Sequence, residues 1–471
     1  MKNYITVLTV LFLLALPVAA QNPSAVKLPD SQAGQRVAAY FKAFNSGDDS
    51  VMRDYIMNNM APETLERRPI DDRLRAFRQV RDDTGSIEIE GVAEVKDSAI
   101  TVLVKSEKGG RFSLIIDFQP QPPNKILGLR VQAGTSPSDN AARRESSSPS
   151  GTEPELIAAL DQHLDQLVKA DEFSGTVLLA KNGKAVFQKA YGLASKEYNV
   201  PNRIDTRFNL GSINKIFTQV AIAQLAESGK LTLDDPIIKL LPDYPNRQAA
   251  EKITIRQLLD HKSGIGDYVN EKFSATPKDN FRRIADFLPL FAAEPLAFEP
   301  GTNNQYSNGG YIVLGAIIEK VSGQDYYTYV REHVFKPAGM ENTEYYEADA
   351  VVPNVATGYT LRSKAGGDAR RNNIYLRPGR GSSAGGGYST TDDLLKFTIA
   401  LRNRKLIANR ENFGMMAGDG LGIAGGAEGI NAVMEVDPAS GYTIIAMSNY
   451  DPPSAINIGK KVRELLRGLK R

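Results

Sequence analysis

Two β-hairpins are predicted near the two ends of residues 154–471, and they limit the folds that this part of the chain can adopt. The four alternating apolar segments are Ser174–Ala180, Ala185–Tyr191, Ile430–Asp437 and Tyr442–Ser448. The first pair is joined by Lys181-Asn182-Gly183-Lys184, and Asn-Gly is a strong signal for a two-residue turn. Helical spacing appears at Leu156–Val168, through much of the middle and at Ala455–Leu469. The order predicts an α+β domain in which distant segments build one antiparallel sheet covered by helices.

A smaller α+β domain is predicted over residues 25–133. Helical spacing at Ser31–Asn45, Ser50–Met60 and Ile70–Asp83 is followed by alternating strand-like segments, with Gly109-Gly110 as a hairpin signal. This order resembles the nuclear transport factor two-like fold, which often encloses a pocket. Because no cluster of titratable residues stands out here, we favour a stabilising or docking role over ligand binding.

The two ends of this small domain carry signals of a different kind. Residues 134–153 are rich in Ser, Pro and charge and lack apolar side chains to bury, which predicts a flexible linker. Lys2, the apolar run from Ile5 to Leu16 and the small residues Val18-Ala19-Ala20 predict a signal peptide over residues 1–20. An uncleaved membrane anchor is the alternative. We expect a secreted or periplasmic protein with no membrane span in the mature chain.

The composition excludes several classes of function. Lys and Arg number 57 against 55 Asp and Glu, and no basic stripe with interleaved aromatic residues suggests nucleic-acid binding. The absence of Cys removes thiolate nucleophiles and thiolate metal sites. Only His163, His261 and His333 are present, without zinc-site spacing, so no metal or other cofactor is expected.

The segment Phe208–Lys230 holds the first candidate for chemistry. Its apolar spacing predicts a helix that begins with Ser212 as N-cap and stops at Gly229. Ser212 and Lys215 are three residues apart and would project from one face of the first turn. Burial of the lysine would lower its pKa and supply a neutral amine to deprotonate the serine. A capping serine beside a surface lysine is the alternative, since short motifs recur by chance, as at Ser24–Lys27.

Further blocks follow this segment in a fixed order. They are Leu258–Gly264 (LLDHKSG), Phe298–Gly301 followed by Tyr306-Ser307-Asn308, and Gly385–Leu394 (GGGYSTTDDL). With Ser212-Ile213-Asn214-Lys215, these blocks resemble the serine β-lactamase and penicillin-binding-protein superfamily, in its class C-like branch, over nearly all of residues 154–471. The resemblance implies an antiparallel sheet flanked by helices, with a helical subdomain.

The resemblance also implies roles for individual residues. Ser212 would form an acyl-enzyme, and Lys215 would help to deprotonate it. Tyr306, as phenolate or through hydrogen bonding, would carry the proton to the leaving group, while Asn308 would orient Lys215 and hold the substrate; a cleft tyrosine without a catalytic role is the alternative for Tyr306. His261 is expected to be structural, because a Ser-His-Asp triad would normally need a G-x-S-x-G elbow around the serine.

One block departs from the family's pattern. Where a Lys or His is expected before a small residue and Gly, the chain has Ile423. Gly425 and Gly426 remain, so the Gly426 N–H could still complete an oxyanion hole with that of Ser212. The resemblance and the signal-peptide pattern together imply an exported serine hydrolase acting on ester, amide or small peptide bonds. The departure at Ile423 favours an esterase or D-amino-acid peptidase over a strong β-lactamase. A weak or catalytically silent binding protein for a small molecule or peptide is the alternative.

Overall fold

The computed structural model describes most of the chain and divides it into two compact units, Met1–Ser147 and Ser148–Arg471. The described residues are 28–67, 70–96, 98–108, 111–119, 121–133, 151–362, 369–409 and 420–469. The predicted signal peptide, the Ser24–Lys27 pair, the Gly109-Gly110 turn and residues 134–150 of the predicted linker lie outside them. No helix among the described residues is long and apolar enough to cross a membrane.

The first unit places its helices before its strands, as the change of apolar period predicts. The helices are α1 (Gln32–Ser46), α2 (Asp49–Asn59), α3 (Pro62–Arg67) and α4 (Ile70–Thr84). The strands form an antiparallel meander, β1 (Ile87–Lys96), β2 (Ala99–Ser106), β3 (Arg111–Phe118) and β4 (Ile126–Ala133). Side chains such as Phe44, Val102 and Ile116 fill the core between the two layers. Its likeness to nuclear transport factor two stays a prediction.

The second unit contains the predicted antiparallel sheet, in the order β13-β14-β15-β5-β6. Its strands are β5 (Gly175–Lys181), β6 (Lys184–Tyr191), β13 (Leu421–Ala427), β14 (Ile430–Asp437) and β15 (Tyr442–Ser448). Asn182 and Gly183 both have positive φ angles, 53° and 80°, which the expected two-residue turn requires. The sheet joins strands from both ends of the unit, and the glycine-rich β13 forms one of its edges.

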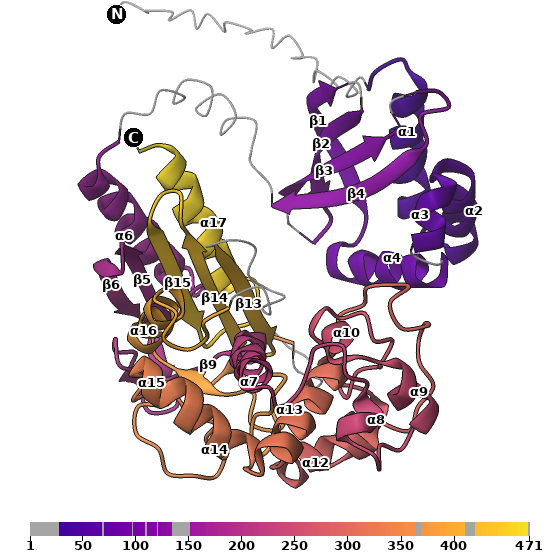
Figure 1. Ribbon diagram of the computed structural model, residues 1–471. Helices are drawn as coiled ribbons and strands as arrows, with labels where there is room; N and C mark the ends of the chain where they lie inside the picture. Colours follow the sequence, from indigo (N-terminus) through magenta and orange to yellow (C-terminus); the bar gives the residue numbers. More distant parts are fainter. Residues whose placement is uncertain are drawn as a thin grey trace, which may run out of the picture. The chain divides into compact units, whose positions relative to one another are not determined.

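Helices cover both faces of this sheet, as expected (Figure 1). The helices α6 (Glu153–Lys169) and α17 (Ser454–Arg467) lie on one face, and α7 (Lys215–Glu227) and α16 (Thr391–Arg402) on the other. Side chains alternate along a strand, so neighbouring residues of β5 enter different cores. Val177 and Leu179 enter the core beneath α6 and α17, while Leu178 and Ala180 enter the core on the side of α7 and α16. The α7 face carries the larger core.

A helical region joins the two halves of the sheet. It contains α8 (Ile237–Leu240), α9 (Arg247–Lys252), α10 (Ile255–Leu259), α11 (Glu271–Ala275), α12 (Ile284–Phe287), α13 (Asn308–Ser322), α14 (Tyr326–Val330) and α15 (Lys336–Ala338). The long helix α13 packs against α7. A short pair, β9 (Phe208–Asn209) with β12 (Tyr388–Ser389), ties the segment before Ser212 to the glycine-rich stretch that begins at Gly385.

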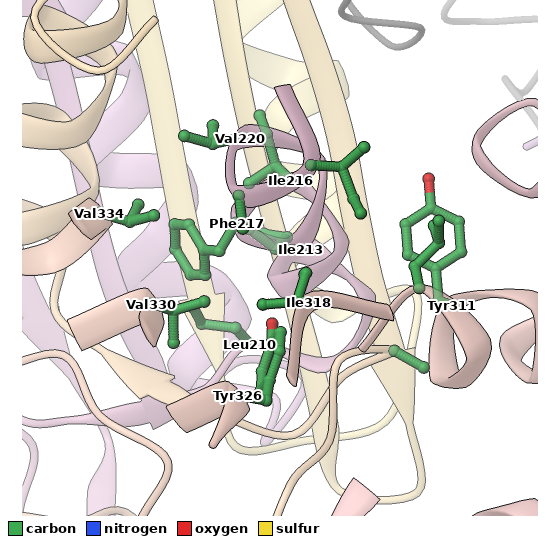
Figure 2. Packing of buried hydrophobic residues seen from close by; sticks show 14 of the residues in the cluster. Leu210, Ile213, Ile216, Phe217, Val220, Tyr311, Ile318, Tyr326, Val330 and Val334 are labelled. Carbon is green, nitrogen blue, oxygen red and sulfur yellow. The ribbon is translucent and has the colours of Figure 1, made fainter. Parts of the chain in front are cut away.

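The helix α7 is buried on every side rather than along one stripe. Ile216, Phe217 and Val220 are fully buried, and Figure 2 shows them within a cluster that includes Val330 and Val334. The predicted start of this helix is wrong. Residues Gly211–Asn214 form a 3-10 turn, α7 begins at Lys215, and Ser212 lies inside the turn instead of capping the helix. Gly211, with φ of 50°, makes this tighter entry possible.

Candidate active site

Two glycines, one on each side, let the edge strand β13 pass against the turn that carries Ser212. A Cβ atom on Gly425 would lie 2.0 Å from the Leu210 carbonyl oxygen and 2.8 Å from the Ser212 backbone nitrogen. A Cβ on Gly211 would lie 2.9 Å from the Gly426 nitrogen. Real Cβ contacts are longer than this, so only glycine allows this approach. The structure therefore brings the backbone of Gly425 and Gly426 beside Ser212.

Lys215 is fully buried one turn further along, with its Nζ directed at three oxygen atoms. Nζ donates to Asn308 Oδ1 at 2.7 Å and to the Ala384 carbonyl oxygen at 2.5 Å, and it lies 3.3 Å from Ser212 Oγ. Burial lowers the pKa of the ammonium to about 7, against the smaller attraction of the Asp267 carboxylate. A substantial fraction of Lys215 is therefore a neutral amine near neutral pH.

Tyr306 approaches Ser212 from the loop before α13. Its hydroxyl donates to Ser212 Oγ at 2.7 Å, and half of the residue is exposed to solvent. Burial of the hydroxyl end raises the pKa of the phenol, and the hydrogen bond with Ser212 offsets part of this rise. The raised pKa disfavours the phenolate form that the sequence left open. Tyr306 is placed to relay a proton as a neutral phenol.

His261 holds the loop that carries Tyr306. Its ring lies against the Tyr306 ring at 4.6 Å between centroids, and its Nδ1 accepts a hydrogen bond from the Ser307 backbone N–H at 3.2 Å. Burial and the nearby Lys215 lower the pKa of the imidazole to about 4. The ring contact and the hydrogen bond fit the expected structural role. The lowered pKa keeps the imidazole neutral at physiological pH.

Asn308 is the first residue of α13 and connects Lys215 to a carboxylate that the sequence analysis did not identify. Its Oδ1 accepts from Lys215, while its Nδ2 donates to Asp267 Oδ2 at 2.8 Å. The backbone N–H of Asn308 reaches the same oxygen at 3.3 Å. Asp267 lies three residues beyond the Leu258–Gly264 block. Its position just after this block is the sequence feature that could have identified it as a residue of the site.

Ile423 lies two residues before Gly425 and on the same face of β13. It is 7% exposed and belongs to the core cluster on the α7 side of the sheet. The residue that replaces the family's cation is therefore an uncharged side chain packed into the core, on the strand that passes the Ser212 turn.

Comparison with known proteins agrees with this geometry. The family model named Beta-lactamase matches residues 160–467. The chain belongs to this family. The predicted membership of the serine β-lactamase and penicillin-binding-protein superfamily and the predicted fold class are thus confirmed. All residues placed around Ser212 lie within the matched range.

Relatives and solved structures extend the comparison. PbpX of Bacillus subtilis is 33% identical over 54% of this chain and 62% of its own length, so the chain spans less than two thirds of that relative. The crystal structure of a penicillin-binding protein from Bacillus halodurans is 30% identical, with a TM-score of 0.58 over 64% of this chain and 99% of that protein. A D-amino acid amidase from Ochrobactrum anthropi, 21% identical with a TM-score of 0.57 over 66% and 98%, shares the fold.

Proposed function

We propose that this chain is a serine hydrolase that forms an acyl-enzyme through Ser212. The observation that carries the proposal is the burial of Lys215 beside Ser212, because burial makes a neutral amine available where a serine proton must be removed. Family membership supports the same class of enzyme.

In the proposed acylation step, Lys215 Nζ accepts the Ser212 proton while Oγ bonds to the substrate's carbonyl carbon. The carbonyl oxygen becomes an oxyanion, for which we assign the backbone N–H groups of Ser212 and Gly426 as donors. A donor of this kind contributes on the order of a hundredfold or more to a rate. When the tetrahedral intermediate collapses, the bond to the leaving group breaks and Tyr306 donates its proton to that group. Tyr306 then regains a proton from the Lys215 ammonium, which returns Lys215 to its neutral form.

Deacylation reverses these roles. Water takes the place of the leaving group, and its oxygen bonds to the acyl carbon while one of its protons passes to the neutral Lys215 amine, with Tyr306 as a relay. The bond between the acyl carbon and Ser212 Oγ then breaks, Oγ takes the proton back from Lys215, and the acyl group departs as a carboxylic acid. Asn308 holds Lys215 throughout and donates no proton to the reaction.

The uncharged side chain of Ile423 favours neutral substrates. A Lys or His at this position would attract a substrate carboxylate, so its replacement disfavours strong penicillin or D-Ala-D-Ala recognition. Ester, neutral amide or small peptide bonds are the proposed substrates, and the D-amino acid amidase with this fold supports the amide class. The same observation favours the second candidate, a binding protein for a small molecule or peptide that turns over weakly or not at all.

We further propose that the chain is exported, because of the signal-peptide pattern over residues 1–20, and that residues 134–153 are a linker between a domain at 25–133 and the hydrolase domain at 154–471. Release of two folded fragments by limited proteolysis within 134–153 would support this division.

The function is tested by treating the full mature chain with a fluorophosphonate probe and measuring intact mass. We expect one adduct, lost in Ser212→Ala and retained in Ser228→Ala, a matched control for an exposed serine just after α7. A folded protein that takes up no adduct would favour the binding protein. A substrate panel of neutral esters, D-amino acid amides and penicillins then ranks the proposed bonds.

A further inference from the structure

The partners of Lys215 determine where its lone pair points once the amine is neutral. Asn308 Oδ1 and the Ala384 carbonyl oxygen lie 2.7 and 2.5 Å from Nζ, and both can only accept hydrogen bonds. A neutral amine has two N–H bonds, so these two oxygens use both of them. The lone pair is left facing the third neighbour, Ser212 Oγ at 3.3 Å, whose proton it must accept.

This arrangement depends on which end of the Asn308 amide faces Lys215. A carboxamide can present either its oxygen or its NH2 group, and the hydrogen-bond network decides between them. With the amide reversed, Nδ2 would donate to the amine, and the lone pair would be occupied instead of facing Ser212. The Ala384 carbonyl has no such freedom, because it belongs to a buried backbone whose N–H is bound to Ser382 Oγ.

Asp267 removes the ambiguity at Asn308. An ionised carboxylate only accepts, and Asp267 Oδ2 receives hydrogen bonds from Asn308 Nδ2 at 2.8 Å and from the Asn308 backbone N–H at 3.3 Å. The other oxygen, Oδ1, receives the Val269 N–H at 2.9 Å, which fixes the carboxylate itself. We infer that Asp267 is a positioning residue that holds the Asn308 amide with its oxygen toward Lys215 and so directs the lone pair of the base at Ser212.

The inference rests on the acyl-enzyme function proposed above and adds a measurable electrostatic effect. Asp267 is the carboxylate that raises the pKa of Lys215 against the lowering effect of burial. Other titratable groups around the amine are the Tyr306 and Tyr311 rings, at 4.8 and 5.4 Å from Nζ, and His261. The two phenols have raised pKa values and the imidazole a lowered one, while β13 presents the uncharged Ile423. These neighbours therefore keep one charge state from about pH 5 to pH 9.

The test compares the pH dependence of fluorophosphonate labelling in the full chain and in Asp267→Asn. Loss of the carboxylate lowers the pKa of Lys215, so the midpoint of the profile should move to lower pH. Without the carboxylate, the Asn308 amide loses its fixed orientation. The labelling rate at the high-pH plateau should then fall on the order of tenfold or more, as for a lost hydrogen bond to a charged group. Asp267→Glu, which keeps the charge, should retain the midpoint and recover part of the plateau.

A double-mutant cycle shows whether Asp267 acts through Asn308. In an Asn308→Ala background, Asp267→Asn should lower the plateau no further. A plateau that falls by the same factor in both backgrounds would overturn the inference, as would a midpoint that does not move in Asp267→Asn. If the wild-type chain itself takes up no probe, the proposed function fails. If it labels and Asp267→Asn labels with the same profile, only the role of Asp267 fails.

Discussion

The pH dependence of Ser212 labelling distinguishes Lys215 from the other bases near the nucleophile. With a pKa of about 7, the neutral fraction of Lys215 is about one tenth at pH 6, one half at pH 7 and nine tenths at pH 8. The rate of reaction with an uncharged fluorophosphonate should therefore rise about tenfold from pH 6 to pH 8 and then level off, because only the neutral amine accepts the proton.

Other bases would give other profiles. A lysine with an ordinary pKa near 10.4 would give a rise of about a hundredfold over the same range, with no plateau at pH 8. His261, with a pKa lowered to about 4, would give a flat profile above about pH 5. A base action of Tyr306, whose pKa is raised, would give a rate that still increases above pH 10.

The assay measures second-order labelling rates at half-unit steps from pH 5 to pH 9.5, with circular dichroism at each pH to show that the protein stays folded. Lys215→Met, which keeps a long unbranched side chain, should label poorly at every pH. A flat profile, a hundredfold rise without a plateau, or an undiminished rate in Lys215→Met would refute the assignment of Lys215 as the base.

Two further substitutions test the strand beside Ser212. Gly425→Ala should lower the labelling rate by about a hundredfold, the scale of a lost oxyanion donor, because its Cβ would lie 2.0 Å from the Leu210 oxygen; Gly422→Ala on the same strand, where a Cβ meets open space, should label like wild type. Equal rates in the two variants would contradict the proposed approach of β13. Ile423→His should raise kcat/KM for carboxylate-bearing esters relative to matched neutral esters, and no change in that ratio would mean that another residue supplies the charge.

The parts of the fold that the sequence predicted are those whose signals are local. The Asn182-Gly183 turn fixes the register of its hairpin through two positive φ angles, and the second hairpin was predicted at Ile430–Asp437 and Tyr442–Ser448, where the strands lie. The start of α7 was misplaced because Ser212 is a good capping residue by type. Its conformation is set instead by Gly211 and by the strand that passes over it, which belongs to a segment about 200 residues away in the sequence.

The sequence predicted which residues form the candidate site, but it did not predict the hydrogen bonds that connect them. Family blocks brought Ser212, Lys215, Tyr306 and Asn308 together, and the structure places them in contact. The sequence predicted that burial lowers the pKa of Lys215. It could not predict where Nζ points, because two of its partners, Asn308 and the Ala384 carbonyl, lie 93 and 169 residues further along the chain. A backbone carbonyl also leaves no residue-type signal in a sequence.

The distance between Lys215 and Asp267 explains how one site can contain a carboxylate and still keep a neutral lysine. A carboxylate in direct contact with the amine would stabilise the ammonium form and raise its pKa by one to several units, which would remove the base at neutral pH. Here the Asn308 amide stands between the two groups, donating to one and accepting from the other. Asp267 fixes the orientation of the amide, and the amide oxygen in turn fixes the direction of the Lys215 amine. The amide also separates the carboxylate from the amine, which weakens the attraction between their charges. Burial therefore outweighs the carboxylate, and Lys215 is left neutral enough to act and oriented toward Ser212.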